Sequence, residues 1–100
     1  MTYAKKVDKN QAEIVKTGRK LGARIAITSS AGNGFPDTVW QYSYPNGRYR
    51  QKSGHETMLV EIKMPGCKLT PKQQEFHEIF NVHVIETIED VYKLLEINYG

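Results

Sequence analysis

The feature that most restricts the fold is a pair of alternating apolar segments on either side of a turn sequence. Residues 37–44 carry an aromatic ring at every second position from Trp40 onward, and residues 57–64 alternate aliphatic side chains in the same way. A spacing of two is typical of a strand with one face against a core. The sequence Pro-Asn-Gly at 45–47 favours a turn. These segments predict a β-hairpin, with the basic stretch 48–56 as an extended excursion between its strands.

Helices are predicted on both sides of this hairpin. Asp8 is a suitable N-cap, with a glutamine three residues later, and Gly22 follows the last helical position. Thr70 caps a second helix that has Pro71 at its first position. Thr87 caps a third helix, in which apolar residues recur at helical spacing.

Short strands are predicted at 24–28 and 82–85, and the small residues of 29–34 predict a flexible loop. The expected order is therefore helix, three strands, helix, strand, helix. A chain of 100 residues has room for one core, so residues 1–100 are expected to form a single domain.

Composition indicates the compartment. The hydrophobic share of 39% and the charged share of 25% are those of an ordinary soluble protein. The sequence contains no apolar run of membrane-spanning length, and its first residues lack the apolar stretch of a signal peptide. Cys67 is the single cysteine, which indicates a reducing compartment. We therefore expect a cytoplasmic protein that makes no use of a membrane.

Charge is distributed unevenly along the chain. Residues 1–24 carry a net charge of +5, residues 45–72 carry +4, and residues 73–100 carry −5. A protein with one side facing a polyanion would show this pattern. A pair of solvated helical faces would show it equally well.

Polar residues at intervals along the first two thirds of the chain indicate a candidate catalytic site. Asp37 starts one predicted strand, and Glu61 and Lys63 interrupt an otherwise apolar strand beside it. Two carboxylates and the backbone carbonyl of Ile62 suffice for Mg²⁺, which prefers oxygen ligands and keeps several waters. Lys63 is expected on the same face as Glu61, where it could orient a water and stabilise phosphate charge. Glu13 could reach this site if the first helix crosses the sheet.

Each of these motifs alone also fits a simpler role. Glu61 and Lys63 could form a cross-strand charge pair, Asp37 could belong to a turn, and Glu13 could pair with a lysine on its own helix. Gln73 could either close a capping box with the Thr70 backbone or face the cleft beside Lys63. The histidines and Cys67 lack zinc-like spacing.

Taken together, the motifs resemble those of a known family. They are Glu13 in the first helix, Gly34-Phe35-Pro36-Asp37, Leu59-Val60-Glu61-Ile62-Lys63, and Leu69-Thr70-Pro71-Lys72-Gln73 followed by Phe76. In this order they resemble the PD-(D/E)xK nuclease superfamily and, within it, the virus-type replication-repair nuclease (VRR-NUC) domain, over roughly residues 8 to 97.

The resemblance implies a fold and a role for each matching residue. The fold would be α/β, with a restriction-endonuclease-like α-β-β-β-α-β core, a C-terminal helix and a mixed central sheet flanked by helices. Asp37, Glu61 and Ile62 would bind Mg²⁺ or Mn²⁺. Lys63 would be the catalytic lysine, Glu13 the first-helix acid, and Gln73 a cleft-facing catalytic glutamine. The basic insertion at 45–56 departs from the family pattern.

The function expected from these motifs is a metal-dependent endonuclease for duplex or branched DNA, which resembles Holliday-junction resolvases and acts as a homodimer. A two-fold axis would allow symmetric cleavage of two strands. The expected phosphate contacts are Lys16, Arg19, Lys20, Arg48, Arg50, Lys52, Lys68 and Lys72. The alternative is a non-catalytic DNA-binding or assembly module with the same fold.

Overall fold

The computed structural model describes residues 9–45 and 54–99, so most of the predicted excursion at 48–56 lies outside the described residues. The elements in order are α1 (Gln11–Lys20), β1 (Arg24–Ile27), a 3₁₀ turn (Ser29–Ala31), β2 (Thr38–Tyr44), β3 (Gly54–Ile62), α2 (Pro71–Ile79), β4 (Val82–Ile85) and α3 (Ile88–Leu94). The expected order of helices and strands is confirmed. None of the helices in these two ranges is long and apolar enough to cross a lipid bilayer.

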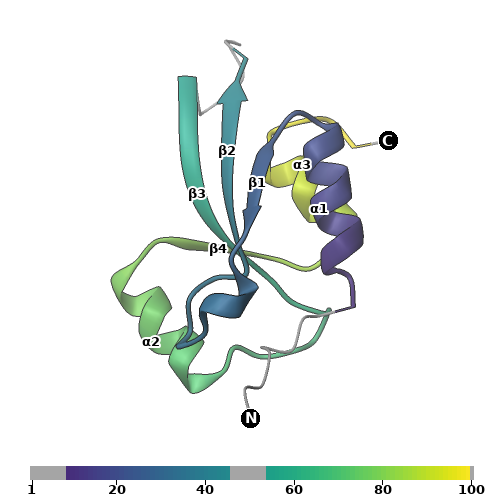
Figure 1. The fold of residues 1–100 in the computed structure, drawn as a ribbon. Helices are drawn as coiled ribbons and strands as arrows, with labels where there is room; N and C mark the ends of the chain where they lie inside the picture. The colour runs from purple at the N-terminus through teal and green to yellow at the C-terminus, as the bar shows by residue number, and fades with distance from the viewer. Residues whose placement is uncertain (1–8, 46–53, 100) are drawn as a thin grey trace.

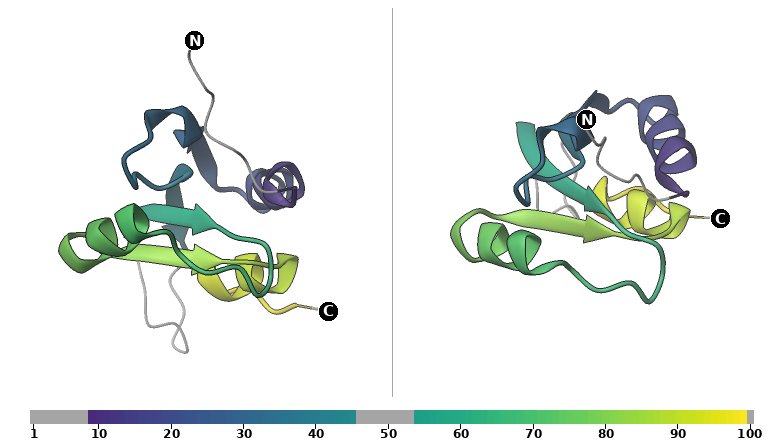
Figure 2. Two further views of the ribbon diagram at one scale, coloured as in Figure 1. Left: turned by 90° about the horizontal axis from the view of Figure 1, so that it is seen from below. Right: turned by 60° about the horizontal axis from the view of Figure 1, so that its bottom comes forward.

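The four strands form one mixed sheet in the order β1-β2-β3-β4. The pairs β1/β2 and β2/β3 are antiparallel, whereas β4 runs parallel to β3. A parallel pair needs a crossover connection, and α2 lies within that connection. Figures 1 and 2 show α1 and α3 side by side, with α2 apart from them beside the segment that enters β2. The described residues thus form a small α/β domain.

The core lies between α1, α3 and one face of the sheet. The predicted alternation of β2 is confirmed, because Trp40, Tyr42 and Tyr44 are buried while the residues between them are exposed. A Cβ atom added to Gly18 would lie 2.6 Å from the Trp40 ring, so α1 packs directly on this face. The Tyr44 hydroxyl donates a hydrogen bond to the Leu94 carbonyl at 2.9 Å, which joins β2 to α3. We refer to this side of the sheet as the Trp40 face.

The bounds of α1 and β3 differ from the prediction. Helix α1 begins at Gln11 with Asn10 as N-cap, and the predicted cap Asp8 lies outside the described residues. Strand β3 begins at Gly54 rather than at residue 57 and ends at Ile62 rather than at 64. Residues 54–56 are mostly polar, but they pair with 42–44 of β2. This pairing makes residues 54–56 part of β3, although they lack the alternation of apolar residues from which a strand is predicted.

The caps of the last two helices agree with the prediction. Thr70 and Thr87 each form a capping box, with Gln73 and Asp90 as the respective third residues. The apolar stripe expected for α2 is not buried, however. The exposed fraction of Ile79 is 77% and that of Phe80 is 48%. Because α2 lies away from the Trp40 face, the core that buries the other two helices does not reach it.

Candidate metal and phosphate site

Asp37 and Glu61 meet where β2 begins and β3 ends. The last pair of the ladder is Thr38 with Val60, and one further step along the same register sets Asp37 opposite Glu61. Directly opposite residues share one face of a sheet, with Cβ atoms about 5 Å apart. Since Thr38 and Val60 belong to the Trp40 face, Asp37 and Glu61 project from the other face.

A hydrogen bond ties the Asp37 carboxylate to the adjacent strand. Its Oδ2 atom accepts from the backbone N–H of Ile62 at 3.1 Å. On the other edge of β3, the N–H of Lys63 donates to the carbonyl of Ile85 in β4. The N–H and C=O of one residue point to the same edge of a strand. The Ile62 carbonyl is therefore directed toward Asp37, as a third oxygen ligand would need to be.

Burial and ligand chemistry fit a hard divalent cation. The exposed fractions of Asp37 and Glu61 are 4% and 1%, so both carboxylates are withdrawn from bulk water. Buried acids on neighbouring strands repel each other, and a shared cation relieves that repulsion. Two carboxylates and a carbonyl supply only oxygen, which suits Mg²⁺ or Mn²⁺ and leaves positions for water. Within residues 9–45 and 54–99, no cluster of three or more His, Cys, Asp or Glu side chains could hold a metal. A metal here would thus depend on the carbonyl and on water for its remaining ligands.

Lys63 lies near the second helix. It follows Glu61 by two residues and is half-buried. Burial lowers the pKa of His77 in α2, and the positive charge of Lys63 lowers it further. The charge of Lys63 therefore reaches the side of α2 that carries His77.

Gln73 closes the capping box of α2 and is also buried. Its Oε1 accepts from the Thr70 N–H at 2.9 Å, and its own N–H donates to the Thr70 hydroxyl at 3.2 Å. Its exposed fraction is 5%. Gln73 and His77 are four residues apart and share one side of α2. The capping role left open by the sequence is thus present, and it uses the amide oxygen of Gln73 rather than the amide nitrogen.

The segment before Asp37 packs against the start of α2. Gly34 has a φ of +82°, and a Cβ atom there would overlap the Lys72 carbonyl and lie 3.0 Å from the Gln73 nitrogen. The rings of Phe35 and Phe76 meet edge to face with centroids 5.4 Å apart. This contact couples the position of Asp37 to that of α2.

Glu13 stands apart from these residues. It is exposed in the first turn of α1, which packs on the Trp40 face, opposite the two buried acids. The start of α1 is nonetheless close to the site, because the Asn10 side chain donates to the carbonyls of Lys63 at 3.0 Å and Glu86 at 2.7 Å. Among the described residues, no recorded contact joins Glu13 to Asp37 or Glu61. The strand register and the Ile62 hydrogen bond thus relate Asp37 to Glu61 and Ile62, while Glu13 lies on the side of the sheet that α1 covers.

The expected phosphate contacts divide into three groups. Lys16, Arg19 and Lys20 are exposed on α1, although the Arg19 guanidinium also donates to the Ile25 carbonyl at 2.9 Å. Lys68 and Lys72 are exposed near α2, where the Lys72 ammonium lies 3.8 Å from a Glu75 carboxylate oxygen. The remaining residues, Arg48, Arg50 and Lys52, lie outside the described residues.

Two residues at this site were not expected from the sequence. Asn10 bridges the ends of β3 and β4, and His77 lies near Lys63. An asparagine just before a helix normally indicates an N-cap. The position of Asn10 in the sequence therefore did not indicate that its side chain bridges two strands. The spacing of four between Gln73 and His77 could have placed His77 on the cleft side of its helix.

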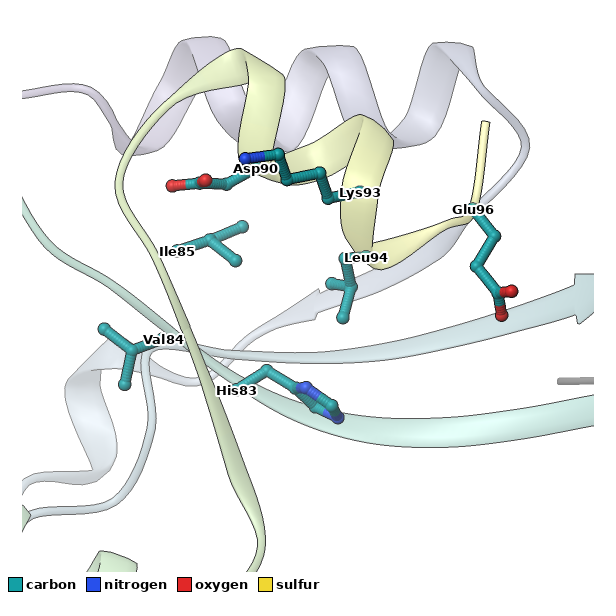
Figure 3. Close-up of a pocket in the computed structure, with 7 residues that line it drawn as sticks. All are labelled: His83, Val84, Ile85, Asp90, Lys93, Leu94 and Glu96. Carbon is teal, nitrogen blue, oxygen red and sulfur yellow. The ribbon is translucent and has the colours of Figure 1, made fainter. Parts of the chain in front are cut away.

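A hollow elsewhere on the molecule contains none of the expected site residues. It is an open pocket of about 430 Å³ between β4 and the end of α3, shown in Figure 3. Its lining residues are His83, Val84, Ile85, Asp90, Lys93, Leu94 and Glu96. The Asp90 carboxylate accepts from the N–H groups of Glu86 and Thr87, so it serves the helix cap. The paired acids at Asp37 and Glu61 remain the better candidate for chemistry.

Comparison with family models, with curated proteins and with solved structures finds no match for this chain.

Proposed function

We propose that this protein is a divalent-metal-dependent endonuclease that hydrolyses phosphodiester bonds in duplex or branched DNA. The observation that carries the proposal is the pairing of Asp37 and Glu61 on one sheet face, with the Asp37 carboxylate bonded to the Ile62 backbone. The proposal includes the restriction-endonuclease-like topology of the VRR-NUC domain that the motifs resemble. It also includes a cytoplasmic homodimer, so that two sites act on two strands.

Each residue of the site has a defined part in this proposal. Asp37, Glu61 and the Ile62 carbonyl would hold Mg²⁺ or Mn²⁺, and the bound ion would make water more acidic and neutralise phosphate charge. The Lys63 ammonium group orients the attacking water and stabilises the charge that develops on the phosphate. Gln73 has an amide nitrogen that can donate to a phosphate oxygen while its amide oxygen caps α2.

Glu13 has the weakest support in the site. Its exposure on the outer side of α1 leaves it a role through water or through the bound DNA. A Glu13→Gln variant should keep its stability within about 0.5 kcal/mol, because surface changes of this kind are small. A loss of cleavage in that variant would show that α1 contributes to the reaction.

The proposal is tested with purified protein on supercoiled, nicked, flapped and four-way DNA, with Mg²⁺, Mn²⁺ or a chelator. We expect cleavage that requires the metal, and binding that weakens steeply as salt rises because Lys and Arg displace counterions. Cleavage in the presence of chelator, or metal-dependent cleavage by a variant lacking both Asp37 and Glu61, would refute the proposal. Sedimentation of the same sample tests the dimer.

A non-catalytic DNA-binding module is the second candidate. The exposed position of Glu13 favours it. It would bind DNA through the same basic residues and cleave none of the four forms with either metal. The two buried carboxylates on adjacent strands are the feature that distinguishes the nuclease proposal from this alternative.

A further inference from the structure

The second helix carries a row of aromatic rings that the proposed chemistry does not use. The rings of Phe76 and Phe80 are stacked with centroids 4.4 Å apart and planes 26° from parallel, and Phe35 meets Phe76 edge to face. Phe80 is 48% exposed, and the neighbouring Ile79 is 77% exposed. We refer to Phe35, Phe76 and Phe80 as the phenylalanine ladder. It is an apolar surface open to solvent at its Phe80 end.

The ladder starts beside the proposed metal site. Phe35 precedes Asp37 by two residues, so their Cα atoms lie at most about 7 Å apart. From Phe35 the rings continue to Phe76 in α2 and to Phe80 at the C-terminal end of that helix. A nucleic-acid strand whose phosphate occupied the site would therefore have its neighbouring bases within reach of the rings.

Charge along the same stripe suits a nucleic acid. Lys72, Phe76 and Phe80 are spaced by four residues, so a cation and two rings lie in one line along α2. The Lys72 side chain is 70% exposed, and its ammonium lies 3.8 Å from a Glu75 carboxylate oxygen in a surface ion pair, which is weak enough for a phosphate to replace the carboxylate. Glu78, two residues from each phenylalanine, projects from the opposite side of the helix. A row of rings with a cation at one end matches the bases and phosphates of a single strand.

Ring geometry decides which form of nucleic acid fits. In a continuous duplex each base face is covered by the next base pair, so a protein ring can stack only on an unpaired or terminal base. Phenylalanine has no polar atom with which to read base edges, so the contact would not depend on sequence.

We propose that the phenylalanine ladder, at Phe80, stacks with an unpaired base of the DNA strand whose phosphate lies at the metal site. This inference rests on the proposed nuclease function and narrows its substrate to DNA with an unpaired segment, such as a flap, a junction or a frayed end.

The test uses a single-stranded oligonucleotide that carries a fluorescent adenine analogue, with chelator present so that no cleavage occurs. Stacking on a ring quenches the analogue. Loss of the ring in Phe80→Ala should weaken single-strand binding by about tenfold and abolish the quenching, since one stacked base contributes on this scale. Phe80→Trp should keep both. The matched control is Ile27→Ala, which removes an apolar side chain of 54% exposure from β1.

Two further measurements separate the possible outcomes. Phe80→Leu keeps an apolar side chain without a ring, so it tests stacking even if Phe80→Ala fails to fold. Cleavage of a flapped substrate relative to plain duplex should fall in Phe80→Leu, while duplex cleavage stays unchanged. If the wild-type protein cleaves no DNA but still quenches the adenine analogue through Phe80, the nuclease proposal fails while the stacking inference stands. The inference would be overturned if the Phe80→Leu variant bound single strands and quenched the analogue as fully as the wild type. It would also be overturned if sedimentation gave this variant half the mass of the wild type, because Phe80 would then lie in a subunit interface.

Discussion

The Asp37 carboxylate accepts a hydrogen bond from the backbone N–H of Ile62, the residue that follows Glu61 in the adjacent strand. This single contact holds one acid at a defined place beside the other. It also directs the Ile62 carbonyl toward them.

Asp37→Asn should separate structure from chemistry. The asparagine oxygen can still accept from the Ile62 N–H, so thermal unfolding followed by circular dichroism should change little. Loss of the negative charge should reduce metal-dependent cleavage by at least about 100-fold, since even groups behind a metal ligand contribute 10- to 100-fold. Wild-type cleavage by a folded Asp37→Asn protein would exclude this acid as a ligand.

Lys63→Met removes the ammonium group and keeps most of the side-chain volume. Cleavage should fall by about 100- to 1,000-fold, as when a charge-stabilising group is lost from a site. The pKa of His77 is lowered by burial and then by the Lys63 charge, so the variant should raise it toward its ordinary value. An NMR titration of the His77 ring measures this. An unchanged His77 pKa would contradict the placement of Lys63 beside α2.

Gly34→Ala tests the contact between the Asp37 segment and α2. The added Cβ atom would overlap the Lys72 carbonyl, and the residue has a φ of +82°. Gly32→Ala is the matched control, because its φ of +73° gives similar backbone strain while no atom lies within 4 Å of the added Cβ. Both should lose about 1 to 3 kcal/mol through backbone strain. Gly34→Ala should lose more, as measured by chemical denaturation; equal losses would contradict the contact.

Stability at alkaline pH should depend on Tyr44. Burial raises the pKa of Tyr44 to about 12, with smaller contributions from Glu56, Glu96 and Tyr42. An unfolded tyrosine loses its proton near pH 10, so this contribution to stability is complete below pH 10 and is lost as the pH rises toward 12. Tyr44→Phe should lower the free energy of unfolding by about 1 kcal/mol at neutral pH through the lost bond to Leu94. Its stability should then fall less steeply between pH 10 and 12. A wild-type slope in Tyr44→Phe would contradict the assignment.

The sequence was informative wherever a pattern was local. The alternation around Trp40 predicted a buried strand face, and the Thr70 and Thr87 caps predicted two helix starts. The antiparallel pairing of β2 and β3 was expected from the predicted hairpin, but the register that sets Asp37 opposite Glu61 was not, because it depends on the residues that join the strands.

Other features depended on tertiary contacts and could not be read from local patterns. Nothing in the spacing of Phe76, Ile79 and Phe80 distinguishes a buried stripe from an exposed one, and their exposure follows from the place of α2 outside the core. Likewise Glu13 has the spacing of a site residue, but the side of the sheet on which α1 packs is set by the contact of Gly18 with Trp40. The side chain of Asn10 donates to the carbonyl of Lys63, which is 53 residues away in the sequence.

Gln73 has two roles that a pair of variants can distinguish. Thr70→Ala removes the hydroxyl that accepts from the Gln73 N–H but leaves the Gln73 side chain and its bond to the residue-70 N–H. Gln73→Met keeps the side-chain volume but removes both the amide oxygen, which accepts from the Thr70 N–H, and the amide nitrogen. Each should lower the free energy of unfolding by about 1 kcal/mol, the usual contribution of a helix cap.

Their effects on cleavage should differ. If the Gln73 amide nitrogen donates to the DNA phosphate, Gln73→Met lowers cleavage by about tenfold, whereas Thr70→Ala leaves cleavage unchanged at a temperature where both variants are folded. Initial cleavage rates, measured beside denaturation curves of the same samples, give both quantities. Equal cleavage by the two variants would assign Gln73 to the cap alone, because the loss of stability that they share would then explain the whole effect of Gln73→Met on cleavage.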